Sequence, residues 1–221
     1  MPSKPLSIRG SMLQVNDLKI AYPHRQVLKG VSFTLAPHET LGIVGRSGSG
    51  KSTLAKAIPR FIPQATGSIL FQGTELMALS ERALRPIRKQ IRLIAQDPNT
   101  SLNPTLKIGV QLLEETPYDA AYGMEILARF GIKHPKTVFH SYPFEISGGE
   151  KQRVAIALAM IMHPPLIIAD EPTTALDAPL QTHILDLLMS LETTLIVISH
   201  NPAVIRRVAR RVLTMEGGLL Q

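Results

Sequence analysis

Residues 45–53 read Gly45-Arg46-Ser47-Gly48-Ser49-Gly50-Lys51-Ser52-Thr53, which satisfies the pattern G-x-x-x-x-G-K-[ST]. The segment follows a short, strand-like run from Thr40 to Val44 and precedes a stretch of helical character from Lys51 to Ile58. Glycines let backbone N–H groups converge on phosphate oxygens, and the positive end of the helix dipole adds to the attraction. The pattern predicts a nucleotide-phosphate site rather than a glycine-rich turn that binds nothing.

Individual polar and charged side chains inside and beyond this segment have predicted roles. Lys51 is the expected contact of the β- and γ-phosphates, and Ser52 is an expected Mg²⁺ ligand. An apolar, strand-like run from Leu166 to Ala169 ends at the acidic pair Asp170 and Glu171. In a P-loop domain an acidic residue at a strand end holds Mg²⁺, usually through water, so we assign this role to Asp170. Glu171 would then polarise the water that attacks the γ-phosphate, although such a pair can also be a solvated turn.

The composition is that of one globular domain. The chain has 221 residues, of which 44% are hydrophobic, and its net charge of +7 fits an anionic partner such as a nucleotide, nucleic acid or lipid surface. It has no cysteine, which excludes a disulfide framework, a thiolate metal site and a cysteine nucleophile. No apolar run approaches the roughly 18 residues that span a bilayer. Met1 to Gly10 has no apolar core of a secretory signal, and Met12 is an alternative start.

Strand and helix signals alternate along most of the chain. Strands are expected at 15–22, 27–35, 40–44, 67–71, 91–94, 166–169 and 194–199, and helices at 51–58, 80–88, 149–162, 180–191 and 204–211. This alternation predicts an α/β fold with parallel central strands. Residues 97–145 differ, because repeated prolines punctuate short helical stretches there. We expect a single domain over 1–221, with an α/β core in 12–96 and 146–221 and a helical subdomain in 97–145.

One further segment identifies a family. Ile146-Ser147-Gly148-Gly149-Glu150-Lys151-Gln152-Arg153 resembles the signature motif of the ATP-binding cassette (ABC) ATPases, which other P-loop enzymes lack. The resemblance implies a P-loop NTPase core with a mainly parallel sheet, an antiparallel β subdomain and an inserted helical subdomain. It also implies that Ser147, Gly148, Gly149 and Glu150 cover the γ-phosphate of ATP held by a partner subunit. The plainer interpretation is that Ser-Gly-Gly only caps a helix.

Other motifs occur in the order of the same family over about residues 13–217. Tyr22 lies where an aromatic residue stacks on the adenine ring, and Gln96 resembles the Q-loop glutamine. Ala175-Leu176-Asp177 resembles the D-loop, and His200 resembles the switch histidine that contacts the γ-phosphate. The resemblance implies ATP and Mg²⁺ as cofactors. The implied site comprises catalytic Glu171 and His200, nucleotide-binding Tyr22, 45–53, Gln96 and Asp170, and the Mg²⁺ ligands Ser52, Gln96 and Asp170.

Two loops look like those of the dipeptide, oligopeptide and nickel importer ATPases, namely 96–104 and Tyr142-Pro143-Phe144-Glu145. The resemblance implies the ATP-hydrolysing subunit of a bacterial importer of a peptide or a nickel or other metal chelate. The implied partners are membrane permease subunits, a second ABC ATPase subunit of the same or a homologous chain, and, indirectly, an extracytoplasmic solute-binding protein. The implied location is peripheral, on the cytoplasmic face of the inner membrane. The transported molecule is left open.

Two other functions are weighed against this one. A soluble ABC ATPase acting on nucleic acid or ribosomes fits the net charge, but the basic residues are not interleaved with aromatic ones, so we do not expect a nucleic-acid partner. A small-molecule kinase would leave the Ser147 to Gly149 segment without a purpose. Three residues depart from the family pattern: Glu150 replaces a glutamine, Asn201 replaces an acidic residue, and Pro59 shortens a helix. None removes a catalytic group, so we expect an active site, with slower or unequal turnover left open.

Overall fold

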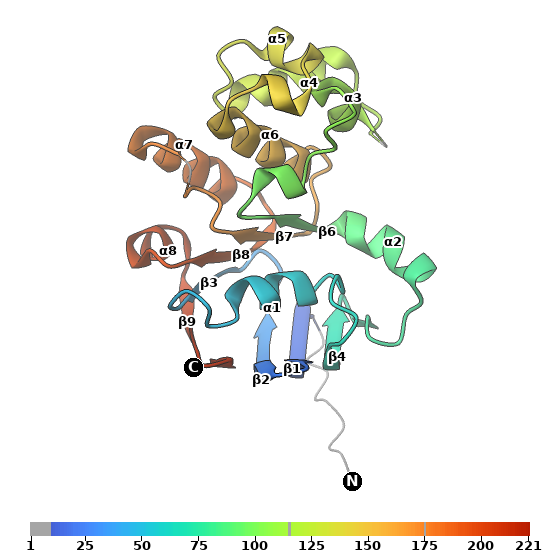
Figure 1. Cartoon of the computed structure of the whole chain (residues 1–221), viewed down its shortest axis with the longest axis vertical. Coiled ribbons are helices and arrows are strands. Elements are labelled where there is room, and N and C mark those ends of the chain that lie inside the picture. The colour runs from blue at the N-terminus through green and yellow to red at the C-terminus, as the bar shows by residue number, and fades with distance from the viewer. Residues whose placement is uncertain (1–9, 115, 175) are drawn as a thin grey trace. The chain divides into compact units, whose positions relative to one another are not determined.

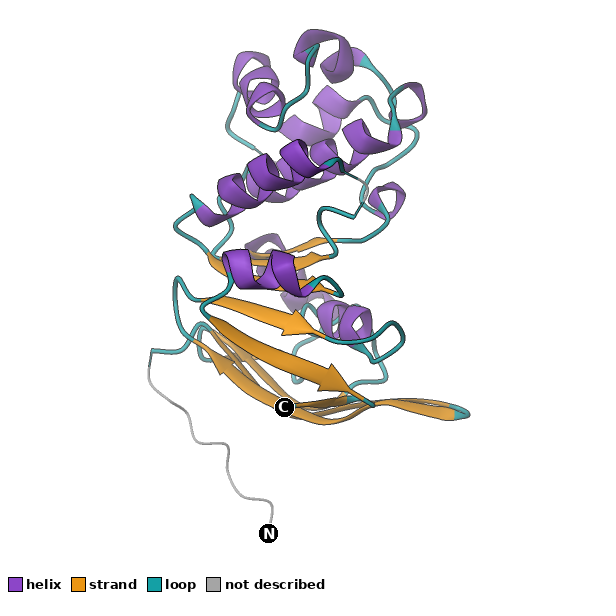
Figure 2. Cartoon of the chain, turned by 90° about the vertical axis from the view of Figure 1, so that its left-hand side faces the viewer, coloured by secondary structure: helices purple, strands orange, loops and turns teal. Residues whose placement is uncertain are grey.

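A computed structural model describes residues 10–114, 116–174 and 176–221 of the chain (Figure 1). The expectations for residues 1–9 and for Ala175 therefore lie outside the described part. The chain divides into two compact units. The first comprises residues 10–93, Pro165–Asp170 and Thr193–Gln221, and the second comprises Ile94–Pro164 and Glu171–Glu192. Apart from Ile94 at the end of one strand, the strands in Figure 2 belong to the first unit, and the second unit is built of helices.

A six-stranded sheet forms the centre of the first unit. Its strands are β3 (Thr40–Val44), β6 (Ile91–Ile94), β7 (Leu166–Asp170), β8 (Thr194–Ser199), β9 (Arg211–Glu216) and β10 (Leu219–Leu220), in the order β10-β9-β3-β8-β7-β6. β8 pairs in parallel with both β3 and β7, and β9 pairs in parallel with β3. Every residue of β7 and β8 is buried, as expected for parallel strands covered on both faces. The predicted α/β fold with a mainly parallel sheet is confirmed.

A second sheet of the first unit is antiparallel. It consists of β1 (Leu13–Tyr22), β2 (Arg25–Leu35), β4 (Thr66–Phe71) and β5 (Thr74–Glu75), in the order β2-β1-β4-β5. Side chains from both sheets and from helix α1 (Lys51–Ala57) join in one apolar cluster, which includes Leu18, Ile43, Leu54 and Ile198. The antiparallel β portion that the family resemblance implied is therefore present, and it shares its core with the parallel sheet.

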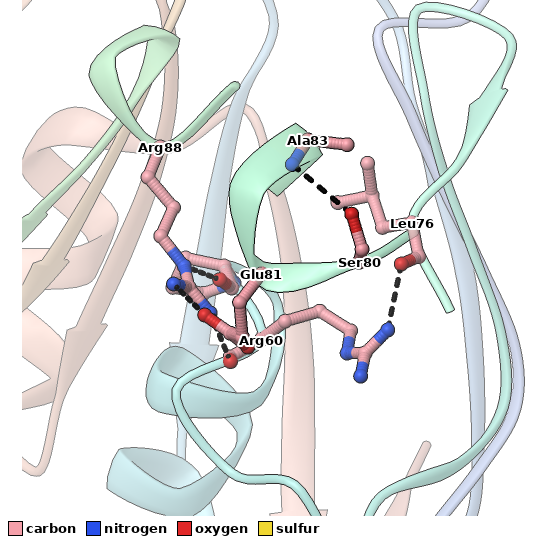
Figure 3. A network of polar contacts seen from close by, with 7 residues as sticks. Arg60, Leu76, Ser80, Glu81, Ala83 and Arg88 are labelled. Atoms are coloured by element: carbon pink, nitrogen blue, oxygen red, sulfur yellow. Dashed lines mark hydrogen bonds and ion pairs between the residues drawn. The ribbon is translucent and has the colours of Figure 1, made fainter. Parts of the chain in front are cut away.

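The early end of α1 is stabilised by a neighbouring helix, α2 (Glu81–Gln90), as Figure 3 shows. Arg88 of α2 donates from Nε to the Pro59 carbonyl oxygen at 2.8 Å and from Nη2 to that of Arg60 at 2.6 Å. The same guanidinium is held by Glu81, with 2.6 Å between Nη1 and Oε2. Carbonyl groups beyond a helix end have no donor within the helix, and here the Arg88 guanidinium donates to two of them. The predicted shortening of the helix at Pro59 is confirmed, and the carbonyl groups of Pro59 and Arg60 have hydrogen-bond donors.

The described residues of the second unit form five α-helices and two short 3₁₀ helices. The α-helices are α3 (Ile108–Leu113), α4 (Ala120–Arg129), α5 (Pro135–His140), α6 (Gly148–Met160) and α7 (Ala178–Met189), and the 3₁₀ helices are η1 (Pro98–Thr100) and η2 (Pro143–Glu145). Phe139 of α5 packs where two neighbouring helices carry glycine. A Cβ atom added at Gly109 of α3 would lie 2.4 Å from the Phe139 ring, and one at Gly123 of α4 would lie 2.8 Å from it. The two glycines thus make the space for the ring. The proposed helical subdomain over 97–145 stays a prediction.

The C-terminal segment differs from the expectation. Helix α8 runs from Pro202 to Val208, and Arg211 begins β9 instead of ending the helix, so the predicted helix over 204–211 was wrong at its end. β9 and β10 were not predicted, because 211–216 is mostly exposed or half-buried and shows no apolar run. Residues 211–216 form a strand because they pair in parallel with β3, with Leu41 opposite Arg211. Within the described residues, no helix has the length and apolar character to cross a membrane.

We expect the substitution Gly109→Ala to lower the free energy of unfolding by about 1–3 kcal/mol, because the added methyl group overlaps the Phe139 ring. Urea denaturation followed by circular dichroism measures the change. Phe139→Leu provides the control: combined with Gly109→Ala it should be less destabilising than the sum of the two single changes. A neutral or stabilising Gly109→Ala, as at an open helical glycine, would contradict the packing described here.

Candidate functional site

The glycine-rich segment forms the turn between β3 and α1 (Figure 1). Gly50 caps α1 in a left-handed conformation with φ of 111°, and Gly48 also has a positive φ of 76°. A Cβ atom at Gly45 would lie 2.3 Å from the Met215 carbonyl oxygen, so only glycine fits there. The Ser49 hydroxyl is buried and finds no hydrogen-bond partner among the described residues. The loop therefore offers closely approachable backbone and a buried hydroxyl, which suits a cradle for phosphate.

Lys51 lies across this loop. Its side chain is largely buried, and Nζ donates to the carbonyl oxygens of Gly45 at 2.7 Å and Arg46 at 2.9 Å. The ammonium charge is thereby held over the loop by two of the loop's own carbonyl groups. Of the other predicted residues, Arg46 and Ser47 are exposed, while Ser52 and Thr53 are half-buried on the first turn of α1.

The hairpin of β1 and β2 reaches the same loop. Tyr22, at the end of β1, lies opposite Arg25 in the register of the two strands and is 44% exposed. Arg25 Nη2 donates to the Gly48 carbonyl oxygen at 3.0 Å. Arg25 thus connects the predicted adenine-stacking residue to the predicted phosphate loop. We did not single out Arg25 from the sequence, where it only separates two strands.

The carboxyl ends of β3, β8 and β7 bring three predicted elements to one edge of the sheet. Val44 lies opposite Ser199 and Asp170 lies opposite Ile198 in the parallel register. The glycine loop follows Val44, and His200 follows Ser199, so both lie at the strand ends that also carry Asp170. Asp170 is buried, with 4% exposure, whereas His200 is exposed. Open α/β sheets bind ligands at this edge.

The second unit contains the signature segment at the start of α6. Ser147 caps the helix: its hydroxyl accepts from the Glu150 N–H at 3.3 Å and donates to Glu150 Oε2 at 2.8 Å, and the same oxygen accepts from the Ser147 N–H at 3.0 Å. These bonds from Ser147 lower the pKa of the Glu150 carboxyl group below its ordinary value. Among the residues that the structure describes, no side chain lies within 4 Å of a Cβ added at Gly148, so the helix start is open there.

A tight loop joins β7 to α7 and carries Glu171, Thr174 and Asp177. Glu171 is 8% exposed and has a left-handed backbone with φ of 51°. A residue other than glycine in this conformation costs about 1–3 kcal/mol and persists where its surroundings hold it. The Thr174 hydroxyl donates to Glu171 Oε2 at 3.0 Å. Asp177 caps α7, with Oδ1 accepting from the Leu180 N–H at 3.0 Å.

Two glutamines hold this loop from different helices. Gln152 of α6 donates from Nε2 to the Pro172 carbonyl oxygen at 3.0 Å, and Gln181 of α7 donates to Thr173 Oγ1 at 3.0 Å. The sequence showed Gln152 beside the signature, but no local pattern indicated its contact, which spans twenty residues of chain. Gln96, the remaining predicted residue, is exposed and belongs to the second unit.

Arg153 is a further charged group near the start of α6. Burial lowers the pKa of its guanidinium below the ordinary value, while the charges of Glu150 and Asp177 act in the opposite direction. Because both carboxylates belong to the signature and D-loop segments, Arg153 connects these two segments electrostatically. It was not among the predicted site residues.

Comparisons with known proteins identify the family. The profile of the ABC transporter family matches residues 28–174. The chain is 43% identical over 229 residues to the oligopeptide transport ATP-binding protein OppD of Bacillus subtilis, covering 94% of this chain and 64% of OppD. It is 36% identical to the metal-staphylopine import system ATP-binding protein CntD of Staphylococcus aureus, covering 95% of this chain and 84% of CntD. The chain thus spans less than two thirds of OppD, and only 43% of YejF of Escherichia coli.

The solved structures agree with this result. The ATP-binding cassette MJ0796, in a dimeric post-hydrolysis state bound to ADP and Pi, superposes with a TM-score of 0.86 at 28% identity, covering 95% of this chain and 97% of that one. The family profile covers well over half of the chain, and the fold, the glycine loop and the signature helix agree with it. The chain therefore belongs to the ABC transporter family and contains its ATPase domain.

Proposed function

We propose that this chain binds ATP with Mg²⁺ and hydrolyses it as the ATP-binding subunit of a bacterial importer. The observation that carries the proposal is the shared edge of β3, β8 and β7, where the glycine loop, His200 and Asp170 meet. A triphosphate needs converging N–H donors and positive charge, while its hydrolysis needs a metal-binding carboxylate and a group that contacts the γ-phosphate. These groups are supplied at one edge, which an unrelated glycine turn would not explain.

The nucleotide is held by residues of the first unit in this proposal. Lys51 contacts the β- and γ-phosphates, the amides of 45–53 surround them, and Tyr22 stacks on the adenine ring. Arg25 supports the last assignment, because its bond to Gly48 connects the Tyr22 hairpin to the loop. Lys51 would exchange its two carbonyl partners for phosphate oxygens, which are stronger acceptors for an ammonium group.

The residues assigned to Mg²⁺ fit that ion chemically. Ser52, Gln96 and Asp170 offer a hydroxyl, an amide carbonyl and a carboxylate, and Mg²⁺ prefers such oxygen donors. When bound, Mg²⁺ neutralises charge that develops on the β- and γ-phosphate oxygens. Glu171 orients and polarises the attacking water, and His200 contacts the γ-phosphate.

Two cassettes act together in the proposed cycle. The Ser147 to Glu150 segment of one copy covers the γ-phosphate held by the other, so bound ATP holds the pair closed and hydrolysis releases it. The open start of α6 at Gly148 supports this assignment, since a bulky neighbour would obstruct an incoming phosphate. The description of MJ0796 as dimeric supports it as well. The second cassette is either another copy of this chain or a homologue of it.

The departures at Glu150 and Asn201 are consistent with an active site. Glu150 completes the cap of α6 with its carboxylate, as a glutamine side chain would with its carbonyl oxygen. Asn201 follows His200, caps α8 by accepting from the Ala203 N–H at 2.9 Å, and donates its own N–H to Ser199 Oγ at 3.1 Å. Both residues therefore hold catalytic segments in place without occupying a catalytic position.

The remaining assignments concern partners and location. The cassette works on the cytoplasmic face of the inner membrane with permease subunits, and an extracytoplasmic solute-binding protein delivers the cargo to those subunits. The second unit offers an exposed apolar surface for a protein contact: Phe144 is 70% exposed and stacks on Tyr142 with 5.5 Å between the ring centroids. The names of OppD and CntD support a peptide or a metal chelate as the cargo. The comparisons do not favour the nucleic-acid alternative.

Glu171→Gln should keep ATP binding but lose on the order of 10²- to 10⁴-fold in the rate of hydrolysis, the usual contribution of a positioned base. Phosphate release at saturating ATP and binding of a fluorescent ATP analogue measure the two quantities. Glu125→Gln, which changes an exposed carboxylate on α4, is the matched control and should behave like the wild type. Near-normal turnover of Glu171→Gln would remove Glu171 from the proposed role.

Lys51→Ala should weaken ATP binding by roughly ten- to hundred-fold, because hydrogen bonds to a charged group are each worth about 1.5–3 kcal/mol. Isothermal titration calorimetry with a non-hydrolysable ATP analogue and Mg²⁺ checks the affinity. Lys56→Ala removes an exposed lysine from the same helix and should leave the affinity unchanged. An unchanged affinity of Lys51→Ala would refute the assignment of the phosphate loop.

A further inference from the structure

Helix α6 (Figure 1) carries a buried polar residue, Gln152. Its side chain is 1% exposed, and the helix that carries it also buries apolar residues, including Val154 and Ala155. Its Nε2 atom donates to the Pro172 carbonyl oxygen at 3.0 Å, but Oε1 finds no hydrogen-bond partner among the described residues. A buried polar atom without a partner is unfavourable, and an apolar side chain of the same shape would avoid it. Packing alone therefore does not account for a glutamine here.

The Pro172 carbonyl oxygen, which accepts this bond, lies next to the proposed catalytic residue Glu171. Pro172 directly follows Glu171, whose carboxylate accepts from Thr174 and whose backbone is left-handed. A small displacement of the Pro172 carbonyl group would rotate the adjoining peptide and move the Glu171 side chain. The bond from Gln152 is buried on both sides, so water does not readily replace it.

The other end of the connection is the signature segment. Gln152 lies on the second turn of α6, whose first turn carries the Ser147–Glu150 cap. A helix of this length moves as a nearly rigid body, so a shift at the cap is transmitted to Gln152. Gln152 donates a hydrogen bond from α6 to the loop that carries Glu171, whereas Gln181 donates to that loop from α7.

We propose that Gln152 is a positioning residue that makes hydrolysis by Glu171 of one chain depend on the ATP that the same chain's signature covers in its partner. This inference rests on the proposed function, because it requires the signature to face the partner's nucleotide. When both sites hold ATP, α6 is seated and Gln152 holds Pro172 so that Glu171 is aligned with its water. When the partner's site is empty, α6 is free to shift and the alignment is lost.

Dimers that contain a single active carboxylate test this directly. Two differently tagged full-length chains are mixed, and dimers that carry both tags are isolated by two affinity steps. The reference dimer pairs the wild type with Glu171→Gln. The first test dimer pairs Gln152→Met with Glu171→Gln, so the glutamine is missing from the chain that supplies the carboxylate. The second pairs the wild type with a chain carrying both substitutions, so the glutamine is missing from the chain that supplies the signature.

The two test dimers contain the same substitutions in equal amounts, so a general loss of stability affects them alike. We expect kcat of the first dimer to fall roughly ten- to hundred-fold below the reference, as for a catalytic group displaced by about 1 Å, with KM for ATP unchanged. The second dimer should stay within about twofold of the reference. Equal losses in both dimers, a loss only in the second, or no loss in the first would each overturn the inference.

Two further variants separate the outcomes. Gln152→Leu also removes the donor and should repeat the result with a different shape. Gln111→Met removes two part-buried hydrogen bonds elsewhere in the second unit, from Gln111 Nε2 to the carbonyl oxygens of Asn103 at 2.9 Å and Leu106 at 2.8 Å. It should lower the thermal unfolding temperature and leave kcat unchanged; a fall in kcat equal to that of Gln152→Met would overturn the inference.

The proposed function fails in a distinguishable way. If wild-type dimers formed with ATP and Mg²⁺ show no turnover, the proposed ATPase function is refuted, and the role of Gln152 falls with it. If the wild-type dimer is active but the reference dimer is not, ATP held in the partner site does not suffice for alignment, and only the inference is overturned.

Discussion

The parallel register of β3, β8 and β7 is the constraint on which the first unit depends. These strands are held side by side by backbone hydrogen bonds, with Val44 opposite Ser199 and Asp170 opposite Ile198. A slip by one residue would turn each buried side chain of a strand to the opposite face and place it against different neighbours, so close packing on both faces holds the register. The edge that carries the glycine loop, His200 and Asp170 is therefore a consequence of core packing. Buried apolar residues that do not belong to the proposed site therefore position the residues that do.

In the second unit, several contacts hold an acidic residue in a backbone conformation that residues other than glycine rarely adopt. Glu171 is left-handed, and Thr174 supports its carboxylate from within the loop. Gln152 and Gln181 hold the following residues from two separate helices. Because hydrogen bonds are directional and short, three such contacts define the loop more closely than apolar packing would. The position of the loop therefore depends on the positions of α6 and α7.

The three departures from the family pattern each have a local structural account. Glu150 closes a cap with Ser147, Asn201 caps α8 beside His200, and the chain beyond α1 at Pro59 is completed by Arg88. In each case polar backbone groups that would otherwise lack partners receive them. These residues therefore preserve the geometry around the site, which is why none of them argues against catalysis.

The sequence by itself determined the glycine-rich turn after β3, the acidic pair at the end of β7, the capped helix α6 and the central buried strands. Each of these is a local pattern: glycine spacing, an unbroken apolar run, or a capping residue before a helix. Such patterns act over one or two turns or one strand, so they can be recognised without knowing what lies nearby. The α/β fold followed from their alternation, and the family resemblance rested on the same segments.

Only the tertiary structure decided the contacts that join distant segments. β9 exists because it pairs with β3, Arg25 matters because it reaches Gly48, and Gln152 matters because Pro172 lies against it. Gly109 and Gly123 are required because Phe139 of a third helix fills the space above them. None of these residues has a local pattern that distinguishes it. Hydrogen bonds and packing depend on distance in space, and folding alone sets that distance for residues far apart in the chain.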